Sequence, residues 1–184
     1  MSDYAHSVVW VVGEPGIGKT TFCRKLLASH GEAGPCVDSW TTFGDECAAV
    51  GSWTGSKFDG GDTVPPSKIL PALLVWRERL ISRKLVLFDG DKFANANAMK
   101  LVAASQCLKG HAFAEASRLV CVFLVGPASA AAGRAARVAA GAKPQNESWV
   151  KGRATKSARF AFAFEAFGDV VAINRDKGET WDGP

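Results

Sequence analysis

The chain has 184 residues, which suits one domain with a sizeable core and is short for two. Its 47% hydrophobic and 22% charged residues exclude a disordered protein, and no apolar run reaches the roughly 20 residues that span a bilayer. The five cysteines show no C-x-x-C spacing and no secretion signal opens the sequence, so we expect a reduced cytoplasmic protein with neither a zinc cluster nor a disulfide framework.

The net charge of +4 is unevenly distributed along the chain. Between positions 134 and 159 there are seven basic residues and one acid, Glu147, which gives this segment a charge of +6. The basic residues are Arg134, Arg137, Lys143, Lys151, Arg153, Lys156 and Arg159. A local excess of positive charge indicates a partner that carries phosphate.

Apolar runs alternate with segments of helical periodicity along the whole chain. Because alternating strands and helices form parallel sheets, we predict a doubly wound α/β domain with helices on both faces. The predicted strands are 7–12, 35–38, 84–88, 119–125 and 170–173; the predicted helices begin at 19, 68, 93 and 128, with a last helix at 160–167; the predicted loops are 51–67 and 141–152.

The first strand runs into the octapeptide from Gly13 to Thr20, which matches G-x-x-x-x-G-K-[ST] in full. Glycines let backbone N–H groups close on a polyphosphate, and the helix that starts at Lys19 directs its positive end to the same place. Lys19 would neutralise the β- and γ-phosphates, and the Thr20 hydroxyl would bind Mg²⁺. The sequence therefore predicts a nucleoside triphosphate site.

Two further strands are predicted to end in carboxylates near this site. The strand at 84–88 runs into Asp89-Gly90-Asp91, a pattern typical of the Walker B magnesium ligand, and spacing leaves open which aspartate faces the metal. Asp38 ends the strand at 35–38. Ligands of parallel sheets bind at the carboxyl ends of strands, so Asp38 is a candidate base for an attacking hydroxyl, with a turn or helix-cap role as the alternative.

The basic segment contains Arg153, Lys156 and Arg159 at three-residue spacing. On a helix start these side chains would project from one side and stabilise charge on a transferring phosphoryl group, as a lid. A solvated basic face and contact with nucleic-acid phosphates are the alternative interpretations.

Together these motifs resemble the nucleotide-kinase branch of the P-loop proteins, which includes adenylate, thymidylate and polynucleotide kinases. The resemblance covers roughly residues 7 to 173. It implies five parallel strands in the order 2-3-1-4-5, one domain over 1–184, a substrate loop at about 51–67 and a basic lid at about 141–159. It also implies ATP and Mg²⁺ as cofactors. In the polynucleotide-kinase type the general base is an aspartate at the position that Asp38 matches.

The strings GSWTGSKFDGGDTVP, FDGD and GRATKSAR look like those of small phage kinases that phosphorylate 5-hydroxymethyluracil in DNA. This narrower resemblance implies a DNA partner with a modified pyrimidine that is turned out of the stack. Trp40, Trp53 and Phe58 would then be placed to stack on the base, and Asp62 to contact it, with packing and a turn as the alternatives.

Three functions remain in view: a kinase for a hydroxymethyl group in DNA, a kinase for a free nucleoside or nucleotide, and a non-catalytic NTP switch. The predicted catalytic residues are Asp38, Lys19, Arg153 and Lys156; the nucleotide-binding residues are Gly13, Glu14, Pro15, Gly16, Ile17, Gly18, Lys19, Thr20, Thr21, Arg134 and Arg159; the metal ligands are Thr20 and Asp89; the substrate-binding residues are Asp38, Trp53, Phe58, Asp62 and Asp91.

Overall fold

A computed structural model of the chain describes residues 6–55, 59–77, 83–106, 117–181 and 183. The strands are β1 (His6–Gly13), β2 (Ala33–Val37), β3 (Trp40–Phe43), β4 (Cys47–Val50), β5 (Leu85–Asp89), β6 (Ser117–Val125) and β7 (Asp169–Asn174). The helices are α1 (Lys19–Leu27), α2 (Ile69–Val75), α3 (Ala96–Gln106), α5 (Pro127–Ala139) and α6 (Glu147–Phe164), with short 3-10 turns η1 (Gly61–Thr63), η2 (Pro66–Lys68) and η4 (Arg175–Lys177).

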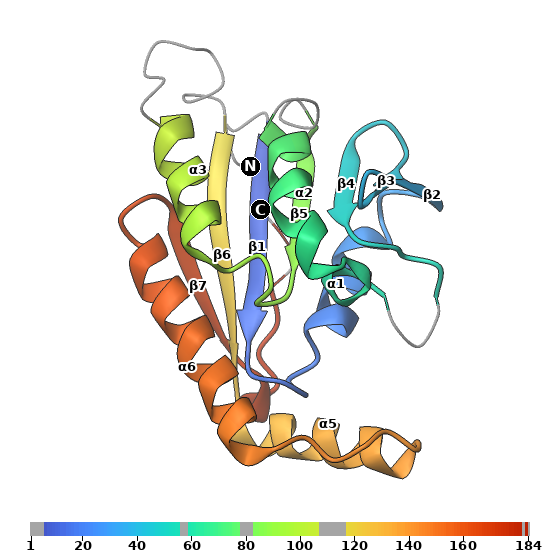
Figure 1. The fold of residues 1–184 in the computed structure, drawn as a ribbon, viewed down its shortest axis with the longest axis vertical. Helices are drawn as coiled ribbons and strands as arrows, with labels where there is room; N and C mark the ends of the chain where they lie inside the picture. The colour runs from blue at the N-terminus through green and yellow to red at the C-terminus, as the bar shows by residue number, and fades with distance from the viewer. Residues whose placement is uncertain (1–5, 56–58, 78–82, 107–116, 182, 184) are drawn as a thin grey trace.

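The strands form one mixed sheet of seven in the order β2-β3-β4-β5-β1-β6-β7 (Figure 1). The five strands from β4 to β7 in this order are parallel, whereas β2 and β3 pair antiparallel at one edge. The expectation of an α/β sheet is confirmed, but the predicted count of five strands and the order 2-3-1-4-5 are wrong.

The error lies in the segment from 33 to 50, where the sequence analysis placed one strand and the structure has three. The predicted strand at 35–38 is the antiparallel edge strand β2, and β4 takes the place beside β5. Asp38 and Ser39 form the turn into β3, with φ of 51° and 70°, and Gly44 forms the next turn with φ of 56°. Two tight turns joining strands of four or five residues leave little periodicity to detect.

Helices cover both faces of the sheet because β1 is apolar on both sides. Val8, Trp10 and Val12 pack with α2, α3 and α6, and Val9 and Val11 pack with α1 and α5. The Trp10 ring stacks on Phe88 of β5 at 4.5 Å between centroids and also lies beside Phe160 and Phe164 of α6. This packing fixes α6 against the central strands.

Helix α6 begins at Glu147, within the segment predicted as a loop to 152. The side chain of Asn146 caps it by accepting hydrogen bonds from the N–H groups of Ser148 and Trp149. Most of the predicted lid is therefore helical. Parts of the predicted helices at 68–83 and 93–109 lie outside the described residues.

At one end of the sheet, the carboxyl end of β1, helix α5 and the start of α6 gather together, at the bottom of Figure 1. Among the described helices, none has the length and apolar character needed to cross a membrane. The cysteines at 23, 36, 47 and 121 form no disulfide, and Cys107 lies outside the described residues.

Candidate active site

The turn between β1 and α1 is built from glycines because its backbone folds tightly against two neighbouring segments. Gly16 and Gly18 have φ of 90° and 91°, which residues with side chains rarely adopt. A Cβ atom on Gly13 would lie 2.6 Å from the carbonyl oxygen of Leu124, and one on Gly16 would lie 2.4 Å from that of Ala130. The turn therefore leads directly into α1, whose first N–H groups are available to an anion.

Lys19 is the cation of this turn. Its Nζ donates hydrogen bonds of 3.0 Å to the carbonyl oxygens of both Gly13 and Glu14. Burial lowers the pKa of Lys19, and the negative charges of neighbouring acids oppose this shift. These acids are Asp89, Asp91 and Asp62. An ammonium group at this depth, next to a helix N-terminus, is suited to neutralising a polyphosphate.

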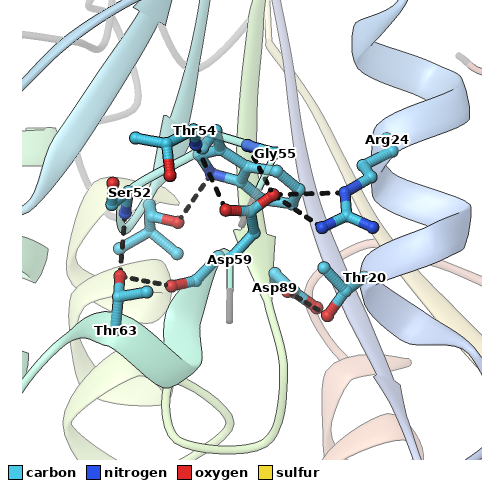
Figure 2. Close-up of polar contacts among 11 residues, drawn as sticks. Thr20, Arg24, Ser52, Thr54, Gly55, Asp59, Thr63 and Asp89 are labelled. Carbon is cyan, nitrogen blue, oxygen red and sulfur yellow. Dashed lines mark hydrogen bonds and ion pairs between the residues drawn. The ribbon is translucent and has the colours of Figure 1, made fainter. Parts of the chain in front are cut away.

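Thr20 and Asp89 are 69 residues apart in sequence and in direct contact in space. The Thr20 hydroxyl donates a 2.9 Å hydrogen bond to Oδ2 of Asp89 (Figure 2). Asp89 is only 3% exposed, and its Oδ1 has no hydrogen-bond partner among the described residues. Burial raises the pKa of Asp89 to about 6, against the opposing effects of the Thr20 hydrogen bond and the Lys19 charge.

These two side chains fit a magnesium ion that arrives with a nucleotide. Mg²⁺ is usually held by one or two carboxylates and completes its shell with phosphate oxygens and water. A hydroxyl beside a carboxylate oxygen that lacks a partner matches that pattern. Within the described part of the chain, no three His, Cys, Asp or Glu side chains are grouped so that they could hold a metal by themselves.

A cavity of about 440 Å³ lies in front of this pair, at the carboxyl ends of β1 and β5. Ligand sites of parallel sheets form at this edge. The lining residues are Pro15, Gly16, Gly18, Lys19, Thr20, Thr21, Asp62, Asp89, Gly90, Asp91, Lys92, Gly133, Arg137, Gln145, Trp149 and Arg153.

Helix α6 carries two cations near the cavity, and one of them, Arg153, lines it. Arg153 donates a 2.6 Å hydrogen bond to the carboxylate of Asp91, and Lys156 donates one of 2.6 Å to the backbone oxygen of the same residue. The buried Ser157 hydroxyl donates to the carbonyl of Gly13 at 3.2 Å, so this helix is also attached to the P-loop. Arg153 therefore lies at the cavity, and Lys156 lies one helical turn further on, beside Asp91.

Helix α5 supports the other side of the turn. Arg134 donates to Oε1 of Glu14 at 3.0 Å, and a Cβ atom on Gly133 would lie 2.0 Å from the carbonyl oxygen of Gly16. Arg137, three residues after Arg134, lines the cavity. The structure thus places Arg134 in an ion pair with the P-loop and Arg137 at the cavity.

The loop that follows β4 is attached to α1 through Asp59, whose side chain is 1% exposed. One carboxylate oxygen of Asp59 accepts hydrogen bonds from Arg24 at 2.6 and 3.2 Å and from the N–H of Gly55 at 3.2 Å (Figure 2). The other accepts from the N–H of Thr54 at 3.1 Å. This loop brings Asp62 to the wall of the cavity.

Several predicted site residues lie elsewhere. Asp38 is exposed in the turn between β2 and β3, where β3 and β4 separate its strand from β5, so its expected place beside the Walker B strand is wrong. Arg159 is exposed and does not line the cavity. Trp40 and Trp53 are 3% and 6% exposed.

The two tryptophans are part of the core, so the expectation that they stack on a substrate base is wrong. Their indole N–H groups donate to the carbonyl oxygens of Ala72 and Val50 respectively, both at 3.0 Å. Phe58 lies outside the described residues.

The sequence analysis did not assign four side chains that line the cavity: Lys92, Arg137, Gln145 and Trp149. Two signals point to them in retrospect. Arg137 follows Arg134 by three residues on one helix, and Asn146-Glu147 is a helix start that places Trp149 in the first turn of α6. Trp149 is 44% exposed, and its ring lies 5.1 Å from the guanidinium of Arg153.

A family model described as P-loop Nucleotide Kinase3 matches residues 4–179. The match covers nearly the whole sequence, so the chain belongs to this family of P-loop nucleotide kinases, and the expected superfamily is confirmed. Membership indicates an NTP-dependent kinase. Among curated proteins, no sequence gives a significant match.

Proposed function

We propose that this P-loop nucleotide kinase transfers the γ-phosphoryl group of ATP, bound with Mg²⁺, to a hydroxyl group. The observation that carries the proposal is the contact between Thr20 and Asp89 at the floor of a cavity lined by Lys19 and Arg153. It brings a phosphate-binding turn, a metal-binding pair and a covering cation into one enclosed space. Phosphoryl transfer depends mainly on such positioning and charge stabilisation.

Each group has a distinct role in this proposal. The N–H groups of the P-loop and the Lys19 ammonium bind the β- and γ-phosphates. Thr20 and Asp89 hold Mg²⁺, which when bound neutralises phosphate charge and orients the triphosphate. Arg153 and Lys156 stabilise negative charge on the transferring group from the side of α6. Arg137, which also faces the cavity, adds a fourth cation for the triphosphate.

For the acceptor, the hydroxymethyl group of 5-hydroxymethyluracil in DNA ranks first. Support comes from the sequence resemblance of the loop at 51–67 and from the concentration of positive charge between 134 and 159. That charge would bind DNA phosphates. A free nucleoside or nucleoside monophosphate is the alternative. Trp149, exposed at the cavity, offers a ring on which either kind of base would stack.

The proposal is tested with γ-labelled ATP and Mg²⁺ and four groups of acceptors: an oligonucleotide with 5-hydroxymethyluracil, the same oligonucleotide with thymine, nucleosides, and nucleoside monophosphates. Label on the modified oligonucleotide alone supports the first acceptor, and label on small molecules supports the second. Release of inorganic phosphate with no labelled acceptor indicates an NTP switch and contradicts the kinase. The Lys19→Met variant is the inactive control.

A further inference from the structure

We propose that Asp62 is the catalytic base that accepts the proton of the acceptor hydroxyl, and that the Arg24–Asp59 ion pair holds its loop in position. This inference rests on the proposed kinase function and assigns the acceptor side of that site. It replaces Asp38, which the sequence suggested for the same task.

The loop that carries Asp62 starts at the carboxyl end of β4, the parallel neighbour of β5. In a parallel sheet, ligands bind beyond the carboxyl ends of the strands. The parallel neighbour of β5 on this side is β4, which ends at Val50. The chain that leaves β4 therefore starts at the active edge of the sheet, and it reaches the cavity at Asp62. Asp38 precedes β3, outside this strand.

Asp62 lies among the charged residues that line the cavity. It shares the cavity wall with Lys19, Asp89 and Arg153, and its side chain is accessible to solvent. Its negative charge raises the pKa of both Lys19 and Asp89, so the carboxylate lies within electrostatic reach of the phosphate-binding cation and the metal ligand. An acceptor hydroxyl that meets the γ-phosphate in this space is also close to Asp62.

The backbone around Asp62 is fixed by a closed set of hydrogen bonds. The N–H of Gly60 donates to the Ser52 carbonyl, the N–H of Ser52 donates to the Thr63 hydroxyl, and that hydroxyl donates to the Gly60 carbonyl, each at 2.8 Å. Lys92 donates to the backbone oxygen of Asp62 at 2.9 Å. The carboxylate thus projects from a braced turn, as positioning of a catalytic group requires.

Two glycines bring this turn against the metal ligand. A Cβ atom on Gly60 would lie 2.1 Å from Oδ2 of Asp89, and one on Gly61 would lie 2.0 Å from the Asp89 backbone oxygen. Gly60 also has φ of 73°. Only glycine permits this close approach without a shift of the backbone. The loop that carries Asp62 therefore lies directly against Asp89 at the end of β5.

The Arg24–Asp59 ion pair connects the same turn to the nucleotide side. Arg24 is one helical turn beyond Thr20 on α1, and Asp59 immediately precedes the two glycines. The carboxylate of Asp59 is buried and accepts hydrogen bonds from Arg24 and from two backbone N–H groups. Arg24 and Asp59 are therefore positioning residues, because they act on Asp62 through the loop.

The chemical step is balanced within the proposed reaction. The acceptor oxygen forms a bond to the γ-phosphorus while the bond from that phosphorus to the β–γ bridging oxygen breaks, and the nucleoside diphosphate leaves with the bonding electrons. The hydroxyl proton moves to a carboxylate oxygen of Asp62 and later to water. Proton transfer of this kind contributes about 10²–10⁴-fold to a rate.

The test compares Asp62→Asn with the wild type on whichever acceptor the labelling assay identifies, starting with the oligonucleotide that carries 5-hydroxymethyluracil. We expect kcat to fall about 10²–10⁴-fold while the Kd for ATP stays within about twofold, and we expect Asp62→Glu to restore part of the rate. Asp45→Asn, in the exposed turn between β3 and β4, is the matched control and should leave kcat unchanged. Asp62 is exposed, so the variant should keep the thermal midpoint of the wild type.

Two outcomes overturn the inference while the kinase stands: full turnover in Asp62→Asn, or loss of turnover in Asp38→Asn alone. Arg24→Gln tests the positioning role and should lower kcat with little change in the Kd for ATP. If ATP binding in Arg24→Gln weakens by as much as kcat falls, the Arg24–Asp59 pair acts on the P-loop instead. If the wild type labels no acceptor, the kinase proposal fails and this inference fails with it.

Discussion

The two sides of the cavity are built in different ways. The phosphate-binding turn is a run of eight consecutive residues that leads from the buried central strand β1 into α1. The acceptor side is the loop that follows β4. It is held by contacts between residues distant in sequence, such as Arg24 with Asp59, 35 positions apart, and Gly60 with Asp89. One is specified by a local motif and the other by tertiary packing.

This difference has an energetic consequence. Lys19 and Asp89 are buried charges whose pKa shifts show that burial works against them, so they serve chemistry more than folding. Asp59 is a buried charge, and both of its carboxylate oxygens accept hydrogen bonds, so it stabilises the fold. We therefore expect loss of the Lys19 or Asp89 charge to reduce turnover without lowering stability, and loss of the Asp59 charge to reduce both turnover and stability.

The largest effect is expected for Lys19→Met. Loss of the ammonium removes the cation at the phosphates and should lower turnover about 10²–10³-fold, as removal of one charge-stabilising group does in other enzymes. The free energy of unfolding should be equal to or above that of the wild type, since a desolvated charge is replaced by an apolar chain of similar length. Turnover assays and urea unfolding measure the two effects. A strongly destabilised variant would contradict the contrast between the two sides.

Asp59→Asn is the corresponding change on the acceptor side. An amide keeps one acceptor oxygen and loses the charge that Arg24 binds, so we expect a loss of about 2–3 kcal/mol in the free energy of unfolding. Turnover should also fall because the loop that carries Asp62 is released. Urea unfolding of this variant, beside Asp45→Asn as the surface control, gives the measurement. A variant with wild-type stability would show that the loop is held by other contacts.

The parts of the site that the sequence predicts follow the same division between a local motif and tertiary contacts. The P-loop, its strand and its helix were predictable because eight neighbouring residues define them, and the apolar runs of β5, β6 and the edge strand β7 are short but continuous. The positions of both motifs at strand ends brought Thr20 near the Asp89-Gly90-Asp91 turn but left open which aspartate faces it, and in the structure Thr20 contacts Asp89.

The acceptor side was not predictable in the same way. The segments Trp40–Phe43 and Cys47–Val50 are four residues each, and their identity as strands depends on pairing with β5, as in Cys47 with Leu85. Without them the parallel neighbour of β5 was misassigned, and Asp38 was chosen in place of the loop after β4. Asp62 was noted from its motif, but nothing local shows that Arg24 and Asp59 meet.

Asp89→Asn is expected to have an effect on stability of similar size and opposite sign. Burial raises the pKa of Asp89 from 3.8 to about 6 in the folded state, so above pH 6 the folded protein holds an unfavourable carboxylate that asparagine avoids. The variant should be more stable than the wild type by about 3 kcal/mol at pH 8, where the shift is fully expressed. As the pH falls from about 6 to about 4 the wild type takes up a proton, and the difference should vanish.

Urea unfolding across this range of pH provides the check. The asparagine oxygen can still accept from Thr20, so the comparison isolates the charge. Magnesium-dependent turnover should be lost in the same variant. A stability difference that does not change between pH 8 and pH 4 would show that the pKa of Asp89 is the same in the folded and unfolded states, and it would contradict the shift caused by burial.

The smallest effect is expected from Gly152→Ala in α6. Gly152 is exposed within a helix, and no atom outside that helix's own nearby backbone lies within 4 Å of where its Cβ would be placed. Alanine should therefore raise the free energy of unfolding by about 0.5–1 kcal/mol through helix propensity alone. Gly133→Ala in α5 is the matched control, because its Cβ would lie 2.0 Å from the carbonyl of Gly16 and should destabilise the P-loop. If turnover in Gly152→Ala falls although stability rises, a stiffer α6 slows the reaction, and opening of the lid that carries Arg153 limits the rate.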